Sequence, residues 1–220
     1  MNVYTYDWLE RNGRLGNQLF QISACAARGL ARQDDLSPWR ISLKADWEYR
    51  KFFSVPDQHF LPLSLGENQI DGETYYFQEL QYVEPVENTV REWFKPSEFS
   101  RNYLEDNYRW FFGNGHHTAV HVRRGDYLNH PKSFPLPSVD YYLKRVEEIQ
   151  TIAPHTEVLV FSDDVDWCRR KFPSYWNYVE GMSRPVELAE RYQTDPEDQW
   201  DLFLQTMCDE HVISNSTFSW

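Results

Sequence analysis

The sequence has few of the patterns that build metal centres or disulfide frameworks. Its three cysteines are widely separated and odd in number: Cys25, Cys168 and Cys208. None forms a Cys-x-x-Cys pair or a cysteine–histidine cluster, and the seven histidines include no His-Glu-x-x-His pair. We therefore expect small buried cysteines in a reducing compartment, and we predict no metal site and no bound cofactor.

Net positive charge and long apolar runs are also lacking. The net charge of −12 argues against nucleic acid as a partner, because nucleic acid requires a basic face. No stretch is long enough to span a bilayer, and the N-terminus does not resemble a signal peptide. A cytoplasmic protein is expected, in which any membrane contact is peripheral. A phosphate ligand would need positive charge gathered locally.

The composition that is present is that of a globular protein of 220 residues, with 41% hydrophobic and 25% charged residues. Its N-terminal part predicts a strand at 3–8, a loop with two glycines at 12–18 and a helix at 19–32. This layout suits an approach to phosphate, although Gly13 to Gln18 matches neither the dinucleotide nor the P-loop motif. Residues 33–98 contain five prolines and predict loops and short elements.

The C-terminal part predicts alternating helices and strands. Aromatic residues from Phe99 to Phe112 suit a helix that closes at Gly113. Strands are expected at 118–122, 157–161, 178–179 and 211–214, with intervening helices that open near 138, 165 and 195. This alternation indicates an α/β fold with a parallel sheet, whose ligands bind at the carboxyl ends of the strands.

Arg123 and Arg124 stand directly after the predicted strand Thr118–Val122. Arginine keeps its charge, and its planar fork matches pairs of phosphate oxygens. Gly125 then permits a sharp turn and a close approach to a ligand. The pattern predicts a phosphate or pyrophosphate clamp, with a pair of surface arginines bridged to carboxylates as the alternative.

Two other strand ends carry polar residues. Asn215-Ser216-Thr217 offers hydroxyl and N–H groups to an anion, and an ordinary turn is the alternative. Asp164 and Asp166 have the spacing of a Mg²⁺ or Mn²⁺ carboxylate pair, but they fall where a helix should start, and acidic residues suit that position. Ser162 or Asp163, at the strand tip, is better placed to meet a base or ribose.

Three segments together resemble the motifs of glycosyltransferase family 11, which contains α-1,2-fucosyltransferases. They are Gly13 to Gln21, His121 to Tyr127 and Ser214 to Trp220. The resemblance implies a GT-B fold of two Rossmann-like halves, here an acceptor-side half at 1–115 and a nucleotide-sugar-binding half at 116–220. Relatives continue past the Ser-Thr-Phe-Ser-Trp motif, so the second half is expected to be shortened.

The resemblance further implies transfer of L-fucose from GDP-β-L-fucose to O2 of a terminal galactose on a glycan acceptor, with inversion and without metal. Arg123, Arg124 and Asp126 would be the catalytic residues. The donor-binding residues would be Gly16, Asn17, Gln18, His121, Ser162, Asp163, Asn215, Ser216, Thr217 and Phe218.

The general base stays open at this point. Asp126 and His121 are candidates within the motifs. Both also have structural interpretations, since Asp126 could orient Arg124 and His121 lies on a strand. Two other functions stay open as well: a non-catalytic remnant that binds GDP-sugar or glycan, and a related transferase with another donor, acceptor or linkage.

Overall fold

The computed structural model divides the chain into two compact units, Met1–Tyr103 and Leu104–Trp220. It describes residues 3–5, 14–31, 40–42, 49–57, 68–69, 77–113, 115–179 and 198–219. Each unit has its own parallel sheet. The boundary between the units falls within helix α3 (Glu98–Asn107). The division into acceptor-side and donor-side halves at residue 115 stays a prediction.

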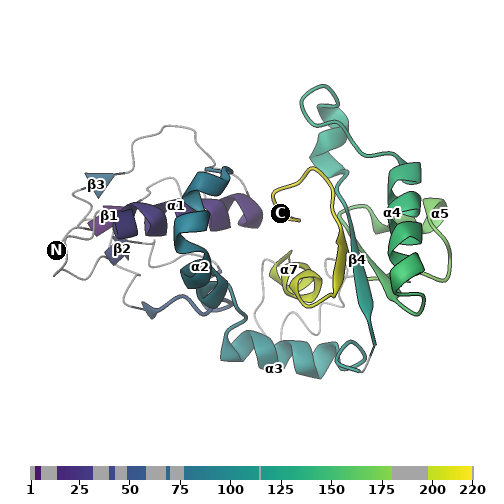
Figure 1. Ribbon diagram of the computed structural model, residues 1–220, viewed down its shortest axis with the longest axis horizontal. Coiled ribbons are helices and arrows are strands. Elements are labelled where there is room, and N and C mark those ends of the chain that lie inside the picture. The colour runs from purple at the N-terminus through teal and green to yellow at the C-terminus, as the bar shows by residue number, and fades with distance from the viewer. Residues whose placement is uncertain are drawn as a thin grey trace. The chain divides into compact units, whose positions relative to one another are not determined.

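The first unit contains a three-stranded parallel sheet in the order β2-β1-β3, formed by Arg40–Ser42, Val3–Thr5 and Asn68–Gln69. Helix α1 (Leu15–Ala31) packs against β1 and β2 (Figure 1). Every side chain from 21 to 27 is buried. This helix is enclosed because small and apolar residues occupy almost its whole circumference in that stretch.

Short elements follow in the first unit. Two 3-10 helices, η3 (Leu80–Tyr82) and η4 (Glu84–Val86), lead into α2 (Glu87–Trp93). Phe52 and Phe53 are buried in the preceding turn. In its described part, the segment 33–98 therefore has the loops and short elements that its prolines predict.

The second unit contains a four-stranded parallel sheet in the order β6-β5-β4-β7. The strands are β4 (His117–Val122), β5 (Glu157–Ser162), β6 (Asn177–Tyr178) and β7 (Glu210–Val212). The connecting helices are α4 (Val139–Ile152), α5 (Val165–Lys171) and α7 (Asp198–Thr206), with a 3-10 helix η5 (Gly125–Asn129) after β4. This confirms the predicted parallel α/β arrangement.

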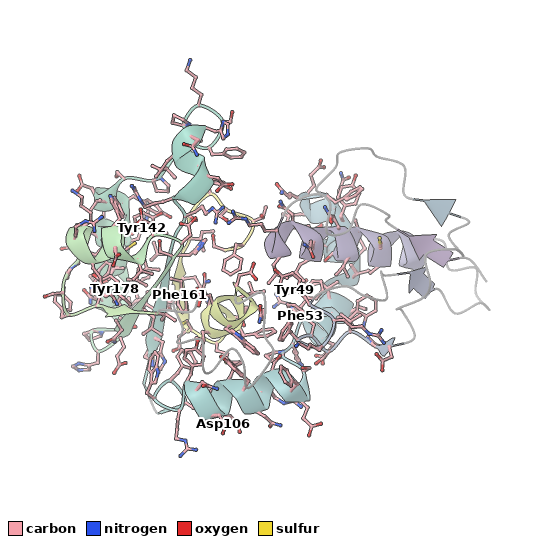
Figure 2. All side chains as sticks on the ribbon, turned by 180° about the vertical axis from the view of Figure 1, so that it is seen from behind. Tyr49, Phe53, Asp106, Tyr142, Phe161 and Tyr178 are labelled. Atoms are coloured by element: carbon pink, nitrogen blue, oxygen red, sulfur yellow. The ribbon has the colours of Figure 1, made fainter. Side chains whose placement is uncertain are left out.

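Helices cover both faces of this sheet (Figure 1). On one face, Tyr142 and Val146 of α4 pack with Val120 and Val160 in one apolar cluster that also contains residues of α5. Alternation along the strand turns Phe161 to the opposite face, the face of α7 (Figure 2). The sheet core is therefore buried on both sides, as is usual for parallel sheets.

Two helix starts lie where the sequence predicts them. The Ser138 hydroxyl accepts a hydrogen bond of 3.2 Å from the Tyr141 N–H and caps α4. The Asp164 carboxylate accepts a hydrogen bond of 3.2 Å from the Trp167 N–H and caps α5. Each cap supplies an acceptor for an N–H group that has no partner within the helix.

Two of the predicted helix boundaries are wrong, and a third lies outside the described residues. Helix α1 begins at Leu15 and not at Leu19. The predicted loop at 12–18 is therefore wrong in its last four residues. The Gln18 N–H already donates a hydrogen bond of 3.1 Å to Arg14 O. Helix α3 ends at Asn107 and not at Gly113, because Phe111 is buried by stacking on His117, 4.6 Å away, in a chain of tight turns. The predicted opening of α7 at 195 lies outside the described residues.

Candidate active site

The carboxyl ends of β4 and β7 mark the place where the strand order of the second sheet reverses. From β4 the chain adds β5 and β6 on one side, and β7 then lies on the other side of β4. At such a switch point the neighbouring loops separate and leave room for a ligand. Arg123 and Arg124 follow β4 here, and Ser214, Asn215 and Ser216 follow β7.

Arg123 is held by two carboxylates. Its Nη1 lies 2.8 Å from Asp163 Oδ2, and its Nη2 contacts Asp126 Oδ1. The guanidinium also lies 5.2 Å from the centre of the Tyr127 ring. Only 12% of the Arg123 side chain is exposed, against 56% for Asp126. The alternative that Asp126 orients Arg124 is therefore wrong, because Asp126 pairs with Arg123.

Arg124 is held differently, by the first turn of α5. Its Nε donates to Asp164 Oδ2 at 3.0 Å, and its guanidinium lies 3.7 Å from the centre of the Trp167 ring. Within the described part of the chain, neither Nη1 nor Nη2 of Arg124 makes a hydrogen bond or ion pair. The two arginines therefore differ in how many of their terminal N–H groups are engaged.

Asp163 organises the turn after β4. Its Oδ1 accepts a hydrogen bond of 2.9 Å from the Arg124 backbone N–H, while Oδ2 faces Arg123. A Cβ on Gly125 would lie far inside van der Waals distance of Asp163 Oδ2. Gly125 thus makes room for this carboxylate. The close approach inferred from the sequence is made to the protein's own Asp163.

Ser162 joins the ends of β4 and β5. It is buried, its hydroxyl donates to Val122 O at 2.8 Å, and the same oxygen accepts from the Asp164 N–H at 2.9 Å. Both contacts are structural, so contact of Ser162 with a base or ribose stays a prediction.

His121 lies beneath the turn after β7. Its Nδ1 is 3.0 Å from Ser214 Oγ, and its ring centre is 5.3 Å from that of Phe218. Burial, together with the nearby charge of Arg123, lowers the pKa of His121 to about 3. The ring is therefore neutral at physiological pH, and a base with so low a pKa accepts protons poorly.

The segment after β7 is folded back on itself. Ser216 Oγ accepts from the Phe218 N–H at 3.3 Å, and Ser216 O accepts from the Ser219 N–H at 3.0 Å. The Asn215 side chain donates to Pro135 O at 2.6 Å, which ties this segment to the loop after β4. Thr217 is half-buried in the same turn. These contacts fix the turn after β7, and binding of an anion there stays a prediction.

Gly16, Asn17 and Gln18 belong to the first unit, in the first turn of α1. Gln18 is buried, and Asn17 Oδ1 accepts a hydrogen bond of 2.7 Å from the Gln78 side chain. The other predicted site residues lie in the second unit, at the ends of β4, β5 and β7. Contact of Gly16, Asn17 and Gln18 with a donor stays a prediction.

The acidic residues of the site serve the arginines and the helix start. Asp164 caps α5, while the Asp166 side chain is 83% exposed and lies 3.6 Å from Arg169. Among the described residues, no cluster of three or more His, Cys, Asp or Glu side chains is arranged to hold a metal ion. Two arginines face three carboxylates, a formal charge of −1 (2 − 3). An anion would therefore be held by directed N–H groups and not by an excess of positive charge.

The sequence analysis did not single out Trp167 or Tyr127. Trp167 lies three residues after Asp164, which accepts a hydrogen bond from its N–H, and Tyr127 lies four residues after Arg123, whose guanidinium it faces. The spacing from a predicted N-cap to an aromatic residue in the first helical turn was the signal available for Trp167.

The chain is similar in sequence and in fold to known proteins. The sequence model described as glycosyl transferase family 11 matches residues 29–220, which is most of the chain. The chain belongs to glycosyl transferase family 11. The match includes the segments at 121–127 and 214–220 that carried the resemblance, whereas the segment at 13–21 precedes it.

Three proteins have sequences similar to this chain. The O-antigen biosynthesis glycosyltransferase WbnK of Escherichia coli is 28% identical over 66% of this chain and 47% of its own length. An alpha-1,2-colitosyltransferase of Escherichia coli is 30% identical over 46% of this chain and 33% of its own length. A galactoside 2-alpha-L-fucosyltransferase of Caenorhabditis elegans is 29% identical over 79% of this chain and 45% of its own length. The family 11 chain thus spans about half the length of the relatives it matches, or less.

Solved structures with a similar fold include those of the fucosyltransferase NodZ of Bradyrhizobium. One has a TM-score of 0.57 at 11% identity and covers 100% of this chain and 91% of NodZ. NodZ crystals soaked with GDP-fucose give a TM-score of 0.53 at 13% identity, with 99% of this chain and 90% of NodZ covered. This likeness, together with the parallel sheets, shows the GT-B-type α/β fold. Among the described helices of the family 11 chain, none is both long and apolar enough to cross a bilayer.

Proposed function

We propose that this family 11 chain transfers L-fucose from GDP-β-L-fucose to O2 of a terminal galactose, with inversion and without a metal ion. The observation that carries the proposal is the pair Arg123 and Arg124 at the switch point between β4 and β7, beside the hydroxyl groups after β7. The relative named galactoside 2-alpha-L-fucosyltransferase supports the linkage, and NodZ soaked with GDP-fucose supports the donor.

The arginines would stabilise the departing nucleotide. The bond from the fucose anomeric carbon to the β-phosphate oxygen breaks as the acceptor hydroxyl forms a new bond to that carbon, so negative charge grows on GDP. Interactions that strengthen as this charge develops lower the barrier to transfer. Arginine N–H groups would supply here what a divalent cation supplies in metal-dependent transferases.

The carboxylates would set the geometry of this clamp. Asp126 and Asp163 fix Arg123, and Asp163 also fixes the backbone at Arg124. Ser216, Thr217 and Phe218 would complete the nucleotide site from the end of β7. Gly16, Asn17 and Gln18 of the first unit would contact donor or acceptor.

Attack from the face opposite the phosphate inverts the anomeric centre, from the β-linked donor to an α-linked product. The acceptor hydroxyl loses its proton to solvent in this step. His121 is a poor acceptor for that proton because it is buried and its pKa is about 3. Asp126 acts in the proposal as the exposed carboxylate that orients Arg123.

A second candidate is the same reaction with another sugar or linkage. The alpha-1,2-colitosyltransferase is 30% identical over its matched region and is named for a sugar other than fucose. NodZ, which shares the fold, is named for an α-1,6 linkage. The proposed donor site would be shared, and the donor and the acceptor position would differ.

The test is a transfer assay in EDTA with a galactose-terminated oligosaccharide and either GDP-fucose, GDP-mannose or UDP-galactose. We expect fucosylated product only with GDP-fucose, and an NMR spectrum that places an α-linked fucose on O2. Arg124→Ala should abolish transfer, while Arg145→Ala, at an exposed arginine of α4, should leave it unchanged.

The other outcomes separate the alternatives. Binding of GDP-fucose without transfer to any galactoside would favour a non-catalytic remnant. Transfer to another position, or from another donor, would favour the second candidate. A chain that binds no GDP-sugar at all would contradict the proposed function.

A further inference from the structure

The two arginines of the site are engaged in different ways, although they are neighbours in the sequence. Both terminal nitrogens of Arg123 face carboxylates, Nη1 that of Asp163 and Nη2 that of Asp126. Arg124 uses only Nε, toward Asp164. Within the described residues, its Nη1 and Nη2 have no hydrogen-bond or ion-pair partner. Arg124 therefore has two terminal NH2 groups, with four N–H bonds, that its anchor does not engage.

The first turn of α5 fixes the plane of Arg124. Asp164 holds one edge of the guanidinium through Nε at 3.0 Å, and the Trp167 ring covers one face at 3.7 Å from its centre. A guanidinium held by one edge and one face has little freedom to rotate. Because the fork of an arginine matches two oxygens of one phosphate, its remaining edge is the part that can bind such a group in pairs.

Trp167 is itself held in place. Its ring packs edge-to-face on Phe172 at 5.9 Å, and both belong to the apolar region between α5 and the sheet. The backbone N–H of Trp167 is bonded to Asp164, so the same short turn sets the anchor and the platform together. Support of this kind restricts a binding side chain to one orientation.

We infer that Trp167 is the positioning residue that presents Arg124 to the diphosphate of the sugar donor, while Arg123 serves to brace the turn. The inference rests on the proposed function for the identity of the donor. It adds a division of roles between the two arginines, and it assigns Trp167 a part in binding.

The experiment is calorimetric titration of the full chain with GDP, inorganic pyrophosphate and guanosine. Trp167→Met keeps a long apolar side chain without a ring face, and Trp167→Phe keeps a smaller ring. We expect Trp167→Met to weaken GDP and pyrophosphate binding about 5- to 30-fold, in the range of a cation–π contact, and to leave guanosine binding unchanged. Trp167→Phe should recover most of the loss, and Trp110→Leu, at an exposed tryptophan of the same unit, should bind like the wild type.

A double-mutant cycle separates positioning from general support of the fold. If Trp167 acts through Arg124, then Trp167→Met should cause no further loss of GDP affinity in the Arg124→Ala background. A further loss there, equal weakening of guanosine, or unchanged pyrophosphate binding would overturn the inference. If Trp167→Met does not fold, Trp167→Phe carries the same comparison with a smaller expected change.

Failure of the proposed function would look different. A wild-type chain that binds pyrophosphate but not GDP would contradict the proposed donor and still permit the test of Trp167. A wild-type chain that binds neither ligand would overturn both proposals. Wild-type binding of GDP with an unaffected Trp167→Met variant would overturn the role of Trp167 alone.

Discussion

Replacing Gly125 by alanine tests the packing at the centre of the site. The new Cβ would overlap Asp163 Oδ2 and lie 3.3 Å from Asp163 Cγ, so the carboxylate must turn away. It then loses the ion pair to Arg123 at 2.8 Å and the hydrogen bond from the Arg124 N–H at 2.9 Å. Both side chains of the ion pair are about nine-tenths buried.

Losing such charge-assisted contacts costs roughly 1.5–3 kcal/mol. Glycine-to-alanine replacement without a clash stabilises by about 0.4–1 kcal/mol through the unfolded chain. We therefore expect Gly125→Ala to lower the free energy of unfolding by about 1–2 kcal/mol, measured by urea denaturation. In the Asp163→Ala background the clash is gone, and the same replacement should become stabilising.

Gly113→Ala is the matched control, because its nearest neighbour would be Trp110 O at 3.8 Å, an ordinary contact. That variant should be as stable as the wild type or slightly more stable. The reasoning would be refuted if the urea concentration at the midpoint of unfolding were the same for Gly125→Ala as for the wild type. It would also be refuted if Asp163→Ala failed to reverse the sign of the effect.

Three further predictions concern pH, capping and metal. His121 is neutral in the folded chain with a pKa of about 3, whereas the unfolded chain takes up the proton below its ordinary value of 6.5. Stability should therefore fall as the pH falls from 6.5 toward 3, by about 2 kcal/mol at pH 5 from this group. His121→Asn should make the free energy of unfolding less dependent on pH in this range. Ser138→Ala removes the cap of α4 and should cost about 1 kcal/mol in urea denaturation; an unchanged value would count against the 3.2 Å cap bond. The affinity for GDP should be the same in EDTA and in Mg²⁺, and a tenfold gain with Mg²⁺ would contradict the arginine clamp.

The sequence predicts the second unit well because local signals and the global fold agree there. Continuous apolar runs predict β4 and β5, and polar capping residues predict the starts of α4 and α5. The first turn of α1 is not predicted, because Gly13 and Gly16 indicate a loop, whereas the helix already includes Gly16. The end of α3 is not predicted either, since Phe111 lies beyond the helix and stacks on His117 at the start of β4.

At the site, the sequence predicts which segments gather but not how they are paired. Position after a strand is enough to bring Arg123, Asp163 and Ser216 to one edge of the sheet. The partners depend on side-chain geometry: Asp126 turns to Arg123, Ser162 turns inward to Val122 O, and Trp167 covers Arg124. The alternative of arginines bridged to carboxylates is thus correct for their contacts. This pairing of arginines with carboxylates is compatible with a phosphate clamp. Among the described residues, Nη1 and Nη2 of Arg124 make no hydrogen bond or ion pair, so they can bind a phosphate.

The central claim is that Arg124 and the turn after β7 hold the diphosphate of GDP at the switch point between β4 and β7. A crystal structure of the chain with GDP, grown in EDTA, tests it most directly. The account predicts the β-phosphate within hydrogen-bond distance of Arg124 Nη1 or Nη2, with Trp167 still stacked behind the guanidinium. GDP bound with its phosphates away from Arg124, or bound through a metal ion, would contradict it.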